Sequence, residues 1–117
     1  VHAVEIDATV HDALRANAAR NGVGERLRLS TALPAAVGHD LVVANIVAPV
    51  LLGHAAALCE RVHRRADGRP AGGLVLSGLR AAETDPVADR YAALLGGPAL
   101  RSSLGDWHCL RFGEPGS

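Results

Sequence analysis

The sequence predicts an α/β protein with an open sheet whose last strand is reversed. Short apolar runs alternate along the chain with longer segments of helical periodicity, a pattern typical of parallel sheets. One such run, residues 41–44, is too short for a helix and has the composition of a strand buried on both faces. Near the end, two strand-like segments flank Gly105-Asp106, a turn signal that predicts an antiparallel hairpin.

The first part of the chain is expected to hold one helix between two strands. Residues 1–6 form an apolar strand, and Asp7 is placed to cap a helix over residues 8–21. The helix ends at an Asn-Gly pair, a typical C-cap. Its predicted buried face consists of Val10, Ala13, Leu14 and Ala18. Residues 26–30 alternate charged and apolar side chains, which predicts a half-exposed strand.

The middle of the chain predicts a strand over residues 40–45 followed by a long helix over residues 50–65. Pro49 stands where that helix would begin, a position that tolerates proline because no intrahelical N–H is needed there. The last turn of the predicted helix is rich in arginine, which would complement the negative end of the helix dipole. The arginines are Arg61, Arg64 and Arg65.

The last part predicts a strand over residues 74–79, a helix over residues 83–95, and a hairpin. The hairpin strands cover residues 99–104 and 107–112. Its aromatic residues, Trp107 and Phe112, are expected in the core. Residues 113–117 are expected to form a disordered tail.

Composition limits the classes of function. The chain has 117 residues, enough for one domain, and its 12 basic and 12 acidic side chains leave no net charge. This balance predicts no direct nucleic-acid contact and no membrane surface, and no segment has the apolar length of a membrane span. Cys59 and Cys109 are not in a paired motif, which favours reduced thiols in the cytoplasm over a disulfide framework.

The candidate functional residue is Asn45, the uncharged amide that ends the strand over residues 40–45. In open α/β sheets, ligands bind at the carboxyl ends of the strands, so Asn45 would lie at the rim of a site. Its side chain offers one acceptor and two donors without charge, which suits an amine ligand. Glu5 ends the first strand, where its carboxylate could accept both hydroxyls of a ribose. Ser77 and Gly78 end the next strand and would line the rim near Asn45.

Other site types are weaker interpretations. Cys59 and His63 lie four residues apart in the predicted helix, but two ligands do not make a metal site, and no metal is predicted. A serine hydrolase is disfavoured because Ser77-Gly78 lacks the glycine that precedes the serine of a nucleophile elbow. Helix capping explains Asp7 better than ligand binding does.

Several motifs together resemble a known family, the class I S-adenosylmethionine-dependent methyltransferases of the PrmA type. The motifs are Ala3-Val4-Glu5-Ile6-Asp7, Asn17, Asn21-Gly22-Val23, Asp40-Leu41-Val42-Val43-Ala44-Asn45-Ile46-Val47-Ala48, Leu76-Ser77-Gly78, Val87, Tyr91 and Trp107. The family usually has aspartate at the position of Glu5 and leucine at the position of Val47. The resemblance covers residues 1–112, which would be the C-terminal part of a methyltransferase catalytic domain.

The resemblance implies S-adenosylmethionine as the cofactor and lysine or terminal amines of a large-subunit ribosomal protein (L-eleven) as the methyl acceptors. Glu5 and Asn45 would contact the cofactor, and Asn45 would also be catalytic by orienting the amine. The fold would be a Rossmann-like methyltransferase sheet lacking its first strand and its glycine-rich loop, both expected upstream. We therefore expect a fragment that is inactive alone and whose complete form is a monomer.

Two alternatives remain at the level of sequence. One is another amine or amide methyltransferase of the same fold. The other is a degenerate, non-catalytic α/β module that binds a partner.

Overall fold

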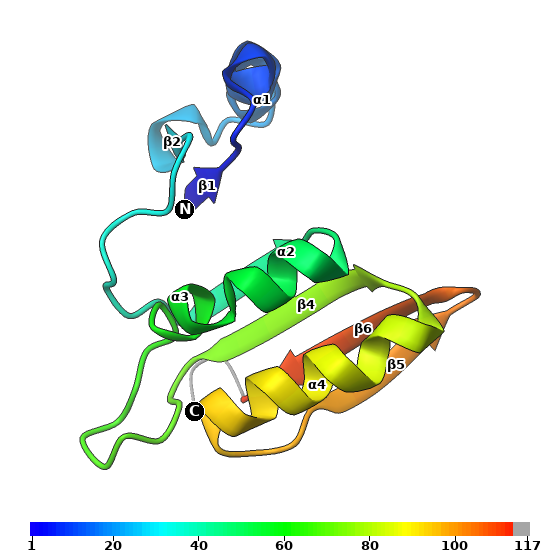
Figure 1. Cartoon of the computed structure of the whole chain (residues 1–117). Helices are drawn as coiled ribbons and strands as arrows, with labels where there is room; N and C mark the ends of the chain where they lie inside the picture. The colour runs from blue at the N-terminus through cyan, green and yellow to red at the C-terminus, as the bar shows by residue number, and fades with distance from the viewer. Residues whose placement is uncertain (114–117) are drawn as a thin grey trace. The chain divides into compact units, whose positions relative to one another are not determined.

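The computed structural model describes residues 1–113, which form two compact units divided between Ala35 and Ala36 (Figure 1). Each unit has its own sheet. Residues 114–117, most of the expected tail, lie outside the described residues. Among the described residues, no helix is long and apolar enough to cross a membrane.

The first unit contains two short parallel strands that pair with each other, and one α-helix lies between them in the sequence. Strand β1 lies opposite β2, with Ala3 opposite Leu29. The elements in chain order are β1 (His2–Val4), the 3-10 turn η1 (Ala8–Val10), α1 (His11–Arg20), the 3-10 turn η2 (Gly24–Arg26) and β2 (Arg28–Ser30). The expected strand, helix and strand are thus confirmed, except that residues 1, 5 and 6 lie outside the first strand. Residues 26 and 27 are likewise not in a strand. The reason is local, because the N–H of Leu27 closes the 3-10 turn on the carbonyl of Gly24.

The ends of the first helical segment confirm the sequence signals, but its predicted apolar face is partly wrong. Asp7 caps η1, and Gly22 adopts a positive φ of 73° directly after the helix. Of the four predicted face residues, Ala18 is buried and Leu14 half-buried, whereas Val10 and Ala13 are exposed. His11 is buried instead. A two-stranded sheet covers only a narrow stripe of the helix, which is why the buried face is smaller than periodicity suggests.

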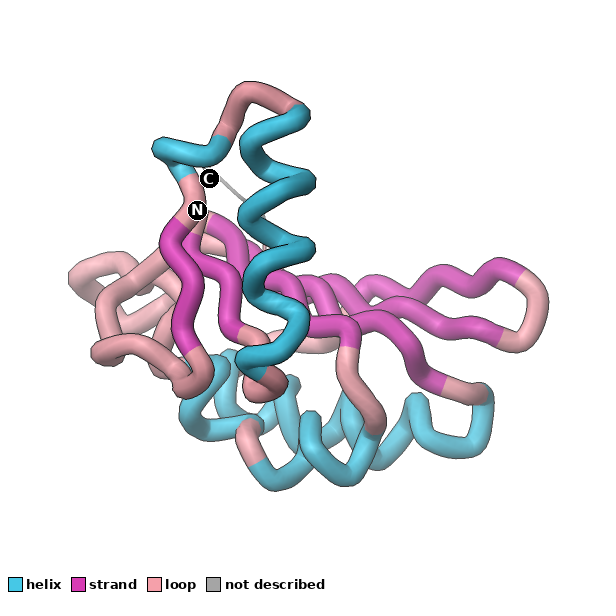
Figure 2. Tube along the Cα trace, turned by 90° about the horizontal axis from the view of Figure 1, so that it is seen from above, coloured by secondary structure: helices cyan, strands magenta, loops and turns pink. Residues whose placement is uncertain are grey.

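The second unit is a four-stranded sheet with helices on one face. The strand order is β3-β4-β6-β5, with β3 parallel to β4 and the remaining pairs antiparallel. The helices α2, α3 and α4 lie together on one side of these strands, as Figures 1 and 2 show. The elements are β3 (Leu41–Asn45), α2 (Ala48–Gly53), α3 (Ala55–Cys59), β4 (Gly73–Leu79), α4 (Ala81–Leu95), β5 (Leu100–Leu104) and β6 (Trp107–Phe112). The predicted hairpin is confirmed, with Gly105 at φ 60° in its turn.

The core of the second unit lies between the helices and the covered face of the sheet. Tyr91 of α4 is fully buried, and its hydroxyl donates a 2.7 Å hydrogen bond to the carbonyl of Leu51 in α2. Its ring lies 6.1 Å from that of Phe112, centroid to centroid, so Phe112 is in the core as expected. The other fully buried large side chains are Leu51, Leu74, Leu76, Leu79, Val87 and Leu110.

The long helix predicted over residues 50–65 is wrong in its extent. Helix α2 ends at Gly53, and α3 ends at Cys59. Beyond it, the chain pairs with His39, whose N–H donates to the carbonyl of Arg61 and whose carbonyl accepts from the N–H of His63. Because these backbone groups are used by a tertiary pairing, they cannot continue a helix. The arginines therefore lie outside the last helical turn. Arg61 nevertheless makes the predicted contact with the negative end of this helix, because its guanidinium donates a 2.6 Å hydrogen bond to the carbonyl of Ala57 in α3.

Two predicted burials are also wrong. Strand β3 is not buried on both faces, because Leu41 and Val43 point to the sheet face opposite α2, α3 and α4 and are 47% and 62% exposed. Trp107 is not in the core and is 55% exposed. It lies at the start of β6 near the hairpin turn, and the guanidinium of Arg80 stacks over its ring at 5.6 Å.

The described strands form two separate sheets, and none of them pairs with both β1 and β3. That an upstream strand joins them remains a prediction.

The buried Tyr91 hydroxyl yields a test of the core. Tyr91→Phe removes the donor to the Leu51 carbonyl while keeping the ring, and should lower the free energy of unfolding by about 1–2 kcal/mol. Urea unfolding measures this, with the exposed Ser102→Ala as a control that should stay at wild-type stability. An unchanged unfolding midpoint for Tyr91→Phe would show that this hydrogen bond does not stabilise the packing of α2 against α4.

Candidate functional site

Asn45 is the last residue of β3, at the carboxyl end of the parallel pair formed by β3 and β4. Its partner in the register is Ser77. Directly after Asn45 the chain leaves the sheet in extended conformation at Val47, and Pro49 lies in the first turn of α2. The predicted rim position of Asn45 is therefore the one observed, because the apolar strand ends where the proline-initiated helix begins.

Strand β4 is irregular beside Asn45. From Leu76 to Leu79, β4 advances three residues, whereas its partner β6 advances two, from Leu110 to His108. The extra residue makes a β-bulge, and Gly78 within it has a φ of 79°. The amide group of Asn45 lies against the bare Cα of Gly78. Three of the predicted rim residues, Asn45, Ser77 and Gly78, are thus brought together.

Glu5 follows directly after β1 in the first unit. Its N–H donates 3.0 Å to the carbonyl of Ser30, and its carboxylate Oε1 accepts 3.1 Å from the N–H of Asp7. The carboxylate is thereby held at the end of the strand by its own backbone. A carboxylate has lone pairs for about four hydrogen bonds, so the bond from Asp7 does not exhaust it.

Asp7 acts as a cap, as the sequence indicates. Its Oδ1 accepts from the N–H of Thr9 at 3.0 Å and from the hydroxyl of Thr9 at 2.6 Å. The hydroxyl and then the N–H of Thr9 hold the pKa of Asp7 below its ordinary value of 3.8, because both bonds favour the charged carboxylate.

His11 is a residue of this site that the sequence reasoning missed. Its Nε2 lies 2.9 Å from the backbone carbonyl of Glu5. A carbonyl can only accept, so Nε2 is the donor in this bond. The buried imidazole therefore fixes the backbone that carries the Glu5 carboxylate. The available signal was a histidine on the sheet-facing side of a helix that starts just after a strand-end acid.

Glu5 and Asn45 belong to different units, the first to Val1–Ala35 and the second to Ala36–Ser117. Cys59 and His63 are not on a common helix face, because α3 ends at Cys59. Within residues 1–113, no group of three or more histidine, cysteine, aspartate or glutamate side chains could hold a metal ion.

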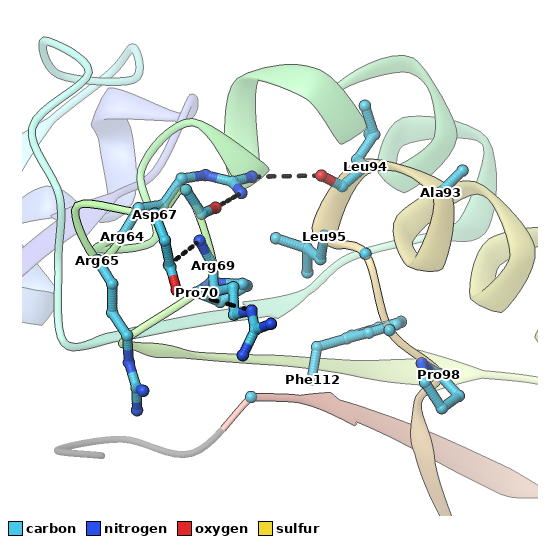
Figure 3. Close-up of a pocket in the computed structure, with 14 residues that line it drawn as sticks. Arg64, Arg65, Asp67, Arg69, Pro70, Ala93, Leu94, Leu95, Pro98 and Phe112 are labelled. Carbon is cyan, nitrogen blue, oxygen red and sulfur yellow. Dashed lines mark hydrogen bonds and ion pairs between the residues drawn. The ribbon is translucent and has the colours of Figure 1, made fainter.

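One cavity of the second unit lies away from Asn45. It has a volume of about 570 Å³ and lies between the loop over residues 64–70 and the end of α4 (Figure 3). Phe112 lines it and pairs with Leu74 at the start of β4, whereas Asn45 pairs with Ser77 towards the other end of that strand. Ligand sites of such sheets form at the carboxyl ends of strands, so this cavity is not the predicted site.

Two arginines that line that cavity, Arg64 and Arg69, have structural partners. Arg64 donates to the carbonyls of Gly68 and Leu94, at 2.8 and 3.3 Å. It thus complements the negative end of α4 rather than the helix that precedes it in sequence. Arg69 forms an ion pair with Asp67 at 3.7 Å.

Comparison with solved structures defines the fold class. The chain superposes with a TM-score of 0.79 on a ribosomal protein L11 methylase from Lactobacillus delbrueckii subsp. bulgaricus, at 24% identity over 97% of this chain and 58% of that one. It also superposes on an O-methyltransferase family protein from Burkholderia thailandensis, with a TM-score of 0.71 and 14% identity. At these identities the likeness shows the fold alone, which is an α/β fold like that of methyltransferases.

The family follows from sequence comparison. The model of the ribosomal protein L11 methyltransferase (PrmA) family matches residues 1–114, so the chain belongs to that family. It is 40% identical over 115 residues to the ribosomal protein L11 methyltransferase of Cupriavidus metallidurans and 44% identical over 110 residues to that of Cupriavidus necator. These matches cover 96% and 92% of this chain but only 34% and 33% of the relatives. The chain thus spans about a third of their length.

The hydrogen bonds of Asp7 give a pH-dependent prediction for the first unit. Thr9→Val removes the stronger donor and should raise the pKa of Asp7 towards 3.8, while the N–H bond of residue 9 still holds it somewhat lower. In the wild type, the cap contributes stability above the ordinary pKa and loses it as the pH falls through the lowered pKa. NMR titration of the Asp7 carboxyl carbon measures the pKa in the wild type and in Thr9→Val, with Thr31→Val as the control. An unchanged Asp7 pKa in Thr9→Val would show that the Thr9 hydroxyl does not lower it.

Proposed function

We propose that the protein containing this chain is an S-adenosylmethionine-dependent methyltransferase. Its proposed acceptors are lysine and terminal amines of the large-subunit ribosomal protein L-eleven. The observation that carries the proposal is the position of Asn45 at the carboxyl end of β3, beside Ser77 and Gly78, in a chain of the PrmA family. The proposal includes a monomeric, cytoplasmic protein without direct nucleic-acid contact.

The residues present fit the cofactor chemically. Glu5 offers a carboxylate at a strand end, which can accept hydrogen bonds from both hydroxyls of a ribose. The bond from the N–H of Asp7 and the bond from His11 to the Glu5 carbonyl limit the movement of this carboxylate before a ligand arrives. Such preorganisation reduces the entropy that binding would otherwise cost.

S-adenosylmethionine, when bound, supplies an activated methyl group. The role proposed for Asn45 is to hold the neutral acceptor amine in line with that group. Its Oδ1 accepts a hydrogen bond from the amine N–H, a neighbouring backbone carbonyl accepts a second, and the nitrogen lone pair is then directed at the methyl carbon. An uncharged amide suits this task because it does not favour the protonated ammonium as a carboxylate would. The amine proton leaves to solvent.

The contribution of Asn45 would be one of alignment. Fixing a nucleophile in a reactive geometry can remove several kcal/mol of the barrier, since the entropy of bringing the groups together has already been lost on binding. The β3–β4 pairing places Asn45 on a strand rather than on a loop, which restricts the position of its backbone.

The first test concerns Asn45 in the full-length protein. Asn45→Ala should lower the single-turnover rate of methyl transfer by about a hundredfold at saturating cofactor, because the amine loses its orienting acceptor. Asn45→Asp keeps acceptor oxygens and should retain partial activity. The control is Ser102→Ala on β5, which should react at the wild-type rate.

Wild-type turnover by Asn45→Ala would show that Asn45 is an ordinary strand-end residue, and it would contradict the proposed mechanism. If saturating S-adenosylmethionine rescued both Asn45 variants, cofactor contact would be its only role.

The second test concerns the ribose contact of Glu5. In the full-length protein, Glu5→Ala should weaken cofactor binding by about 1–3 kcal/mol, the range for losing a charge-assisted hydrogen bond. Glu5→Asp keeps the carboxylate and should have a smaller effect. Calorimetric titration measures the affinity, and Glu25→Ala, an exposed acid of η2, serves as the control. If Glu5→Ala bound normally while Asp7→Ala did not bind, Asp7 would be the ribose ligand instead.

A further inference from the structure

Gly78 occupies a backbone conformation that side chains disfavour. Its φ of 79° lies in the left-handed region, and it forms part of the bulge where β4 carries one more residue than β6. This conformation is not specific to position 78, because Gly96 at the end of α4 has nearly the same φ of 80°.

The surroundings of Gly78 distinguish it from that glycine. A Cβ atom built on Gly78 would collide with Oδ1 of Asn45, whereas Cγ of Asn45 at 3.6 Å and the carbonyl of Ile46 at 3.9 Å would remain in ordinary contact. A Cβ built on Gly96 would meet no atom within 4 Å. The space that a side chain would need at position 78 is thus occupied by one atom, the amide oxygen of Asn45.

The identity of that atom determines what a substitution would do. Oδ1 is the far end of a side chain that can rotate, so the clash can be relieved by turning the Asn45 amide, with little movement of the backbone. An alanine at position 78 would therefore leave β3 and β4 paired but change the direction of the amide.

We propose that Gly78 is a positioning residue for Asn45. Its missing Cβ leaves the space in which the amide oxygen of Asn45 lies, and thereby sets the direction from which that oxygen can accept a hydrogen bond from the acceptor amine. The proposal rests on the proposed function of Asn45. It adds that the bulge in β4, and not β3 alone, determines the direction in which the amide oxygen of Asn45 points.

The test compares Gly78→Ala with Gly96→Ala in the full-length protein. Both substitutions force alanine into a positive φ, so both should lower the unfolding midpoint to a similar degree. Only Gly78→Ala should shift the side-chain NH₂ resonances of Asn45 in NMR spectra. It should also lower the single-turnover rate by about ten- to a hundredfold, with cofactor affinity unchanged within twofold. Gly96→Ala should react at the wild-type rate.

A double-mutant cycle with Asn45→Ala shows whether Gly78 acts through Asn45. In the Asn45→Ala background the clash is absent, so Gly78→Ala should cause no further loss of rate. If Gly78→Ala does not fold, the double variant Asn45→Ala/Gly78→Ala should fold as well as Gly96→Ala does. A double variant that also fails to fold would overturn the proposal, because the fold itself would then require the glycine.

The outcomes separate the two proposals. Full activity of Asn45→Ala would overturn the proposed function, while shifted Asn45 resonances in Gly78→Ala would still support the structural contact. A slow Asn45→Ala together with a Gly78→Ala variant that matches Gly96→Ala in rate and spectrum would overturn the positioning role and leave the proposed function standing. A further rate loss from Gly78→Ala in the Asn45→Ala background would also overturn the positioning role of Gly78.

Discussion

Backbone pairing along both edges of β4 determines where the second unit places its polar side chains. The parallel pairing runs from Leu41 opposite Gly73 to Asn45 opposite Ser77. A slip of one residue would turn every side chain to the other face, so the fully buried Leu74 and Leu76 hold the register. Because that register ends at Asn45, core packing and the position of the candidate site depend on the same pairing.

Much of this arrangement could be predicted from the sequence because the relevant signals are local. Apolar runs bounded by turn residues gave the strands, and Pro49, Gly22 and Gly105 marked a helix start, a helix end and a hairpin turn. The rim position of Asn45 followed from one general property of parallel sheets, that polar residues ending a strand lie at its carboxyl edge.

The features that could not be predicted depend on tertiary contacts. The segment over residues 50–65 is rich in leucine and alanine, yet it forms two helices, α2 and α3, that end at Gly53 and Cys59. The helical conformation does not continue beyond α3 because the next residues pair with His39, which is distant in sequence. The buried His11 is bonded to the carbonyl of Glu5, which lies outside its helix, and this contact is not visible in the helical pattern. The bulge at Gly78 likewise arises because β4 has one more residue than β6 between the pairs formed by Leu76 and Leu79. The sequence pattern of one strand does not show how many residues its partner has.

In the proposed mechanism, Asn45 holds the acceptor amine while Glu5 holds the ribose. A crystal structure of the full-length protein with a bisubstrate analogue, in which an adenosine group is joined to a lysine-like amine, tests it most directly. We expect the amine nitrogen within about 3.2 Å of the Asn45 Oδ1 and both ribose hydroxyls on the Glu5 carboxylate. An amine nitrogen farther than about 4 Å from Oδ1 and held by other residues would contradict it.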